Sequence, residues 1–235
     1  MSTLPSAPSF AQIESYQEFQ NELNSIRSEL ETLITAVKGH KAGEAIYEII
    51  TKLMPLFEQY NLDYVQGNIA NGQNAASYAL KISNYIEAQY KKYSEGDKST
   101  TGEGPADNAI KAYNALKAEI AAHPKIFGSM GQAVLSQLKS AMGGNITSGS
   151  GLDTYWKNSW TINSPSDPGV NTSGPIMQAF SAAQNQAQSE AAYLQAEAKM
   201  ANENYQKYSA SQHDVESNYI NVIKAATTAA QSAGN

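Results

Sequence analysis

The stretch that decides the fold is IMQAFSAAQNQAQSEAAYLQAEAKMANENYQKYSASQHDVESNYINVIKAATTAAQSA, residues 176–233, which contains neither glycine nor proline. Two series of residues spaced by seven run through it, and 14 of their 16 members are apolar or aromatic. The first series is Met177, Gln184, Ala191, Ala198, Tyr205, Gln212, Tyr219 and Ala226. The second series is Phe180, Ala187, Leu194, Ala201, Tyr208, Val215, Val222 and Ala229. Such a ladder is typical of a long helix with a narrow apolar seam. At about 1.5 Å per residue the ladder spans roughly 80 Å, so we expect a rod-like chain.

Two shorter ladders lie in the first half of the chain. One predicts a helix over 9–38, and its members are Tyr16, Phe19, Leu23, Ile26, Leu30, Leu33 and Val37. The motif GHKAG at 39–43 ends this helix, and its length favours an antiparallel hairpin. Pro55 should kink the returning helix, because proline removes a donor and clashes with the preceding turn. The third ladder follows the kink, with the members Leu62, Val65, Ile69, Gly72, Ala76, Ala79, Ser83, Ile86, Tyr90 and Tyr93.

The middle of the chain departs from the heptad pattern. The segment SEGDKSTTGEGPA at 94–106 has the composition of a flexible linker. Helical spacing predicts short helices over 107–122 and 129–142, which Pro124 and the Gly143–Gly144 pair bring to an end. Residues 143–175 hold both tryptophans of the chain, so we expect a long loop that forms a small hairpin or is pinned to the helices by Tyr155, Trp156, Trp160 and Ile162.

The sequence therefore predicts an all-α fold, an elongated antiparallel helical bundle or coiled coil with a kinked second helix, two short inserted helices and a long tryptophan-containing loop. Its segments are a disordered N-terminus at 1–12, a helical hairpin at 13–93, a linker at 94–106, an insert of short helices and aromatic loop at 107–175, and the long coiled-coil helix at 176–230. The alanine-rich seam of that helix fits a thin bundle within one chain or a seam shared between subunits, and the pattern leaves both open.

Composition argues against several classes of function. The chain has 235 residues, a net charge of −6 and a pI of about 5.1, whereas nucleic-acid binding requires clustered cations. With no cysteine, it can form no disulfide, thiolate metal site or cysteine nucleophile. No apolar run reaches the roughly 18 residues of a transmembrane span, and nothing in the sequence supports contact with a membrane surface. The first twelve residues lack the basic and apolar regions of a Sec signal peptide.

No motif for catalysis, a cofactor or a metal is evident. The histidines are His40, His123 and His213, and only the last forms a cluster with more than one carboxylate, together with Asp214 and Glu216. Adjacent residues of a helix point about 100° apart, so this cluster does not converge on a metal ion. The signatures of phosphate loops, dinucleotide sites, zinc peptidases and serine hydrolases are missing. We therefore expect a non-enzymatic protein without a cofactor.

Contact with other proteins is the remaining expectation. Exposed aromatic side chains are typical binding anchors, although tryptophans that fold back over a bundle are equally common. Glutamines in the seam would fix register or partner number if they are buried, and would simply be hydrated if they are not. The candidates for partner binding are Tyr155, Trp156, Trp160, Gln184, Leu194, Tyr205, Tyr208, Gln212, Val215 and Tyr219.

The layout resembles that of the hydrophilic needle-tip and filament proteins of bacterial type III secretion systems. The resemblance is carried by the polar start MSTLPSAPSF, the hairpin around GHKAG and the heptad-patterned helix from Ile176 to Ala230. It implies an exported, non-enzymatic protein that self-assembles in a needle-like structure at the cell surface, with its address in an uncleaved N-terminal segment. The alternatives are an intracellular, cytoplasmic adaptor or scaffold that binds partner helices, and a soluble helical toxin or effector, for which no sufficiently apolar hairpin is present.

Overall fold

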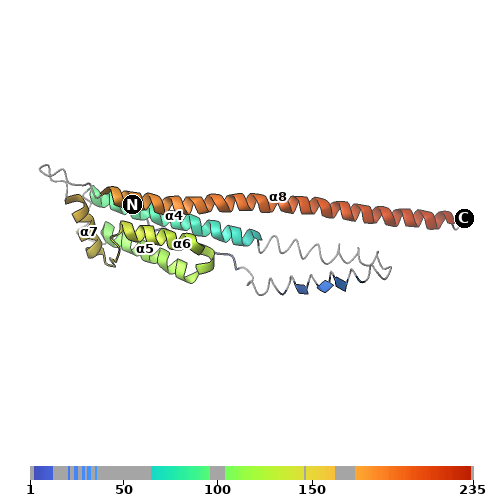
Figure 1. The fold of residues 1–235 in the computed structure, drawn as a ribbon, viewed down its shortest axis with the longest axis horizontal. Coiled ribbons are helices and arrows are strands. Elements are labelled where there is room, and N and C mark those ends of the chain that lie inside the picture. Colours follow the sequence, from blue (N-terminus) through green and yellow to red (C-terminus); the bar gives the residue numbers. More distant parts are fainter. Residues whose placement is uncertain are drawn as a thin grey trace. The chain divides into compact units, whose positions relative to one another are not determined.

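The computed structural model describes residues 3–12, 65–95, 104–145, 147–161 and 173–233, together with eight positions between Asn21 and Thr35. This part of the chain contains helices and no strand, which confirms the predicted all-α class (Figure 1). The chain divides into two compact units: unit 1 comprises residues 1–10 and 70–195, and unit 2 comprises residues 11–69 and 196–235. The rod shape and the coiled coil stay predictions.

Helix α4 (Gly67–Ser94) carries most of the third ladder. Every ladder position from 69 to 93 is buried, which confirms the predicted seam over this range; the residues are Ile69, Gly72, Ala76, Ala79, Ser83, Ile86, Tyr90 and Tyr93. The buried hydroxyl of Ser83 donates a hydrogen bond to the Ala79 carbonyl oxygen at 2.8 Å, so this polar member of the seam is satisfied within its own helix.

Helices α5 (Pro105–Ala122) and α6 (Pro124–Ala141) both begin with proline, whose missing N–H is not needed in the first turn. The apolar residues that recur at helical spacing in these two segments are buried, except the partly buried Tyr113; they include Ile110, Leu116, Ile120, Met130, Val134 and Leu138. Helix α5 begins at Pro105, two residues before its predicted start and inside the predicted linker, because Ala106 is buried in the core. Helix α6 begins at Pro124, but the non-helical Gly128 (φ 50°, ψ −145°) divides it, and the part after this glycine corresponds to the helix predicted from Ser129.

Helix α6 ends just before Gly143 and Gly144, as the sequence predicts. Gly143 and Gly144 have φ values of 80° and 82°, a left-handed conformation that favours glycine. The Gly144 N–H donates to the Lys139 carbonyl oxygen at 2.8 Å, which satisfies one of the acceptors left open at a helix C-terminus.

The long loop predicted at 143–175 is wrong over 149–161, because these residues form helix α7 (Gly149–Thr161), and no hairpin forms there. Ser148 caps the helix, and its Oγ accepts a hydrogen bond from the Gly151 N–H at 3.2 Å. The buried residues Leu152, Trp156 and Ser159 recur at helical spacing and turn one face of α7 toward the core. Gly149 and Gly151 lower the helix propensity of this segment, so the sequence did not indicate a helix here.

Helix α8 (Ser173–Ala233) has 61 residues and includes the entire stretch quoted above. Its first part belongs to unit 1 and packs against α4. Phe180 contacts Tyr90 and Leu194 lies against Gly72, so residue numbers rise along α4 as they fall along α8. The two helices are therefore antiparallel, which agrees with the predicted orientation of neighbours in the bundle (Figure 1).

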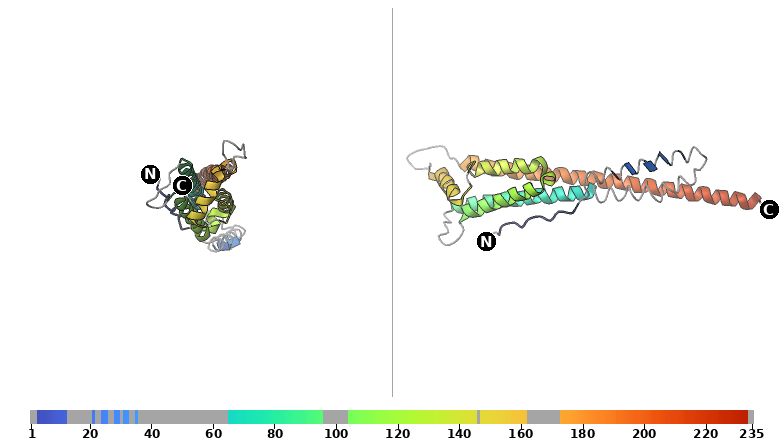
Figure 2. Two further views of the ribbon diagram at one scale, coloured as in Figure 1. Left: turned by 90° about the vertical axis from the view of Figure 1, so that its left-hand side faces the viewer. Right: turned by 90° about the horizontal axis from the view of Figure 1, so that it is seen from below.

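One hydrophobic core fills unit 1. It joins buried residues of α4, α5, α6, α7 and the first part of α8 in a single cluster. Figure 2 shows α4, α5, α6 and the first part of α8 side by side, with α7 across their end. Many core positions on α4 and α8 are alanine, among them Ala75, Ala76, Ala79, Ala183 and Ala187, so the two helices can approach closely.

The N-terminal segment needs a correction. Residues 9–12, where the first helix was predicted to begin, are not helical, and the supposedly disordered N-terminus contributes Phe10 to the edge of the core. The eight described positions between Asn21 and Thr35 are helical, and none of them belongs to the predicted seam. Glu29 is partly buried and the other seven are exposed. The remaining predictions for the first helix, the 39–43 turn and the kink at Pro55 fall outside the described residues.

Candidate interaction surfaces

The first candidate is the tryptophan segment, which the structure places in the core of unit 1. Trp156 is completely buried, and its ring centroid lies 5.2 Å from that of Tyr90 and 5.6 Å from that of Tyr93. Its indole Nε1 donates to the Ala141 carbonyl oxygen at 3.4 Å. A completely buried side chain offers no surface to a partner. For Trp156 the structure therefore favours the interpretation in which the tryptophan packs over the bundle.

The neighbours of Trp156 extend this packing. Tyr93 donates to the Asp153 main-chain oxygen at 3.0 Å, which ties α4 to α7. Burial, followed by the negative charge of Asp153 and a hydrogen bond with that residue, raises the pKa of Tyr93 to about 12, so its hydroxyl remains a donor throughout the pH range in which carboxylates and histidines titrate. Tyr155 is half-buried against the same core. The side chain of Trp160 is outside the described residues.

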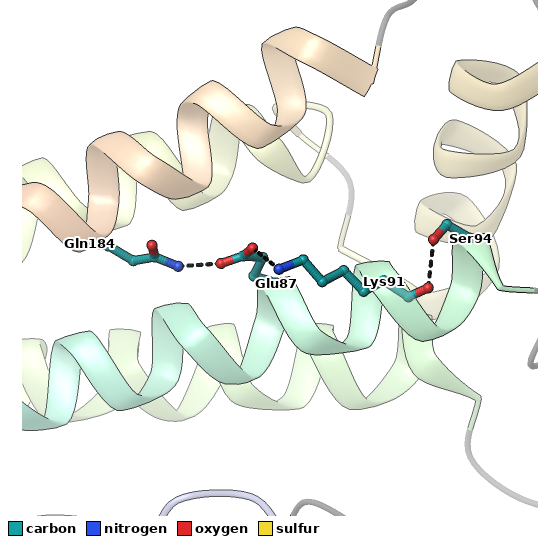
Figure 3. A network of polar contacts seen from close by, with 4 residues as sticks. All are labelled: Glu87, Lys91, Ser94 and Gln184. Atoms are coloured by element: carbon teal, nitrogen blue, oxygen red, sulfur yellow. Dashed lines mark hydrogen bonds and ion pairs between the residues drawn. The ribbon is translucent and has the colours of Figure 1, made fainter.

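The second candidate is Gln184, which takes part in a polar network between α8 and α4 (Figure 3). Its amide donates to the Glu87 carboxylate, which also forms an ion pair with Lys91 at 2.5 Å. Ser94 donates to the Lys91 carbonyl oxygen at 2.6 Å and continues the network to the end of α4. Because amide and carboxylate meet only in one alignment of the two helices, Gln184 specifies the register of the intramolecular seam.

Leu194 marks the last buried position of the α8 seam within unit 1. It is 9% exposed, and a Cβ built on Gly72 would lie 2.8 Å from its Cδ1. The leucine thus packs on the bare backbone of a glycine, which explains why glycine stands in the third ladder. Leu194 is an intramolecular core residue, not a surface anchor.

The remaining candidates lie on α8 within unit 2, and they differ from those above. Tyr205, Tyr208, Gln212 and Tyr219 are half-buried, and Val215 is 37% exposed. Further along, Val222 is 66% and Ile223 47% exposed. Val215, Tyr219, Val222 and Ile223 fall within an arc of about 100° on a helix of 3.6 residues per turn. We call these four residues the distal face of α8; the sequence analysis missed Ile223 because it lies beside the ladder.

An open groove is also present in unit 2, where α4 begins. It is lined by the apolar residues Val65, Ile69, Met200 and Ala201, with Asn68, Glu197 and Asn204 at its polar rim. Met200 is 55% exposed. The groove contains no group suited to nucleophilic or acid–base chemistry apart from one carboxylate, so it has the character of a contact surface.

Among the described residues there is no group of three or more histidine or acidic side chains that could hold a metal ion. Their helices also include none with the length and apolar character of a membrane span. His123 lies at the junction of α5 and α6, with its Nε2 3.9 Å from Glu119. His213 is exposed on α8.

Comparison of the chain with protein-family models, with curated proteins and with solved structures finds no match.

Proposed function

We propose that this chain is a non-enzymatic helical protein that acts by self-association through the distal face of α8. The observation that carries the proposal is the change of environment along one seam. In the series that begins at Phe180, the positions Phe180, Ala187 and Leu194 are buried, Ala201 and Tyr208 are partly buried, and Val215 and Val222 are exposed. Exposed apolar side chains clustered on one helical face are typical of a contact surface.

The apolar side chains of this face are suited to packing against the same face of a second copy of the chain. Burying a valine or isoleucine side chain contributes about 1.5–3 kcal/mol, so the four residues of the face could hold a weak helix–helix contact. The flanking positions on one edge of the face, Ser211, Asn218 and Ala225, carry no charge, whereas Glu216 borders the other edge beside Ile223. Two copies that pair along the uncharged edge therefore avoid the like-charge repulsion that such positions use to reject partners.

Replacing both Val222 and Ile223 with aspartate should lower the association constant about 100-fold or more, since the contact would bury carboxylates without partners. Sedimentation equilibrium over a range of concentrations measures this constant. The matched control is Ser217→Asp with Asn221→Asp, which adds the same charge at exposed positions on the other side of the helix. A native chain that stays monomeric at all concentrations, or equal losses in both variants, would contradict the proposal.

We further propose that the protein is an exported component of a bacterial type III secretion apparatus, similar to needle-tip or filament proteins. The support is the resemblance in layout together with the polar, proline-containing segment before Phe10. Deleting Ser2–Ser9 should leave folding and self-association intact, because this segment supplies no residue to the buried core.

In a host with a type III apparatus, the same deletion should abolish release into the medium. The measurement is the amount of protein in medium and cells by immunoblot, and the control deletes eight residues from 163–170, outside the long helices. Normal release of the N-terminal deletion would favour the intracellular scaffold.

A further inference from the structure

The N-terminal segment is an extended arm with one aromatic anchor. Residues 3–12 form no helix, and in this arm only Pro5, Pro8 and Phe10 are partly buried. The prolines fix two φ angles near −65°, which limits the freedom that the arm loses when it docks. Leu4 is 43% exposed, so contact is concentrated near Phe10.

The anchor sits in a socket at the junction of α5 and α6. The Phe10 ring centroid lies 4.7 Å from that of His123 and 5.9 Å from that of Phe127, both in edge-to-face geometry. The Asn74 amide of α4 donates to the Ser9 carbonyl oxygen at 3.3 Å. This combination of an aromatic pocket and one backbone hydrogen bond is a recognition site for a short proline-containing segment.

The order of the chain makes this site exchangeable. Residues 1–10 dock on unit 1, but the residues that follow them, 11–69, belong to unit 2. The arm is thus covalently continuous with one unit and bound to the other. A second copy presents an identical socket, and moving an arm from one copy to the next preserves every contact described above.

We propose that the socket of His123, Phe127 and Asn74 accepts the N-terminal arm of a second copy of this chain, so that arms are exchanged between associated molecules. The proposal rests on the self-association proposed above. An arm competes for its own socket at an effective concentration in the millimolar range, so free molecules keep their arms. Association through α8 raises the local concentration of a neighbour's socket to the same range. The arm can then bind either its own socket or that of the neighbouring copy.

The chain has no cysteine, so single cysteines report the docking cleanly. We would mix a tagged Ser9→Cys variant with an untagged Asn74→Cys variant and treat the mixture with a short bis-maleimide. The tag separates the mixed dimer by mass from dimers of one variant. The double variant with both cysteines in one chain tests the intramolecular contact, and Ser136→Cys, at an exposed position of α6, replaces Asn74→Cys as the control for random collisions.

Exchange predicts a mixed dimer whose yield rises with concentration and exceeds the Ser136→Cys control. Adding Phe10→Ala to the Ser9→Cys chain should reduce this yield about tenfold, with unchanged helicity. A mixed dimer no more abundant than the control, at concentrations where the native chain associates, would overturn arm exchange and leave association through α8 standing. A native chain that stays monomeric at all concentrations would instead overturn the proposed function, and arm exchange with it.

Discussion

Replacing Trp156 with alanine should lower the free energy of unfolding of unit 1 by about 3–5 kcal/mol, the usual cost of truncating a large buried aromatic side chain. Trp156 is completely buried, and its ring contacts both Tyr90 and Tyr93. The substitution would leave a cavity between α4 and α7. It would also remove the indole donor from the Ala141 carbonyl oxygen, near the C-terminus of α6.

Urea unfolding followed by far-ultraviolet circular dichroism measures this loss independently of tryptophan fluorescence. The matched control is Tyr155→Ala, which removes the adjacent, half-buried ring and should cost clearly less. If Trp156→Ala instead left stability unchanged and removed binding to a partner, the packed environment of Trp156 would be wrong and its interpretation as a binding anchor would be right.

The parts of the fold that follow from period alone could be predicted from the sequence. Every position of the third ladder from Ile69 to Tyr93 is buried, because helical spacing places these residues on one face of α4. The ladder does not name six further buried positions of this helix, which are Asn71, Ala75, Tyr78, Ile82, Tyr85 and Gln89. Helix α7 could not be predicted in the same way. It has only 13 residues, and its two glycines lower the helix propensity of the segment, so its short apolar face did not indicate a helix. The capping residue Ser148 was the one signal in the sequence for a helix start.

The candidate sites show a second limit of periodicity. A ladder states which residues share a face, but not which surface covers that face. Gln184 and Gln212 occupy equivalent positions, yet only Gln184 has an acceptor, Glu87, on a described neighbouring helix. Phe10 lay outside every ladder, and the two rings that it contacts, His123 and Phe127, lie more than 100 residues further along the chain. Such tertiary contacts leave no periodic trace in the sequence.

Leu194 and Val215 make this limit measurable, because the heptad pattern predicts that both are buried in the seam. Leu194→Asp should destabilise unit 1 by about 3 kcal/mol or more, since it removes a leucine packed on Gly72 and places a carboxylate there. Val215→Asp should change stability by less than about 1 kcal/mol, because the valine is 37% exposed, and should act on self-association instead.

Urea unfolding measures both effects: both tryptophans lie in residues 70–195, so their fluorescence reports on unit 1, and far-ultraviolet circular dichroism follows the helices of both units. Gln195→Asp, at the exposed position next to Leu194, controls for the added charge and should be nearly neutral. Equal destabilisation by Leu194→Asp and Val215→Asp would mean that the seam is buried along its whole length within one chain. The distal face of α8 would then be part of the core, and self-association would need another surface.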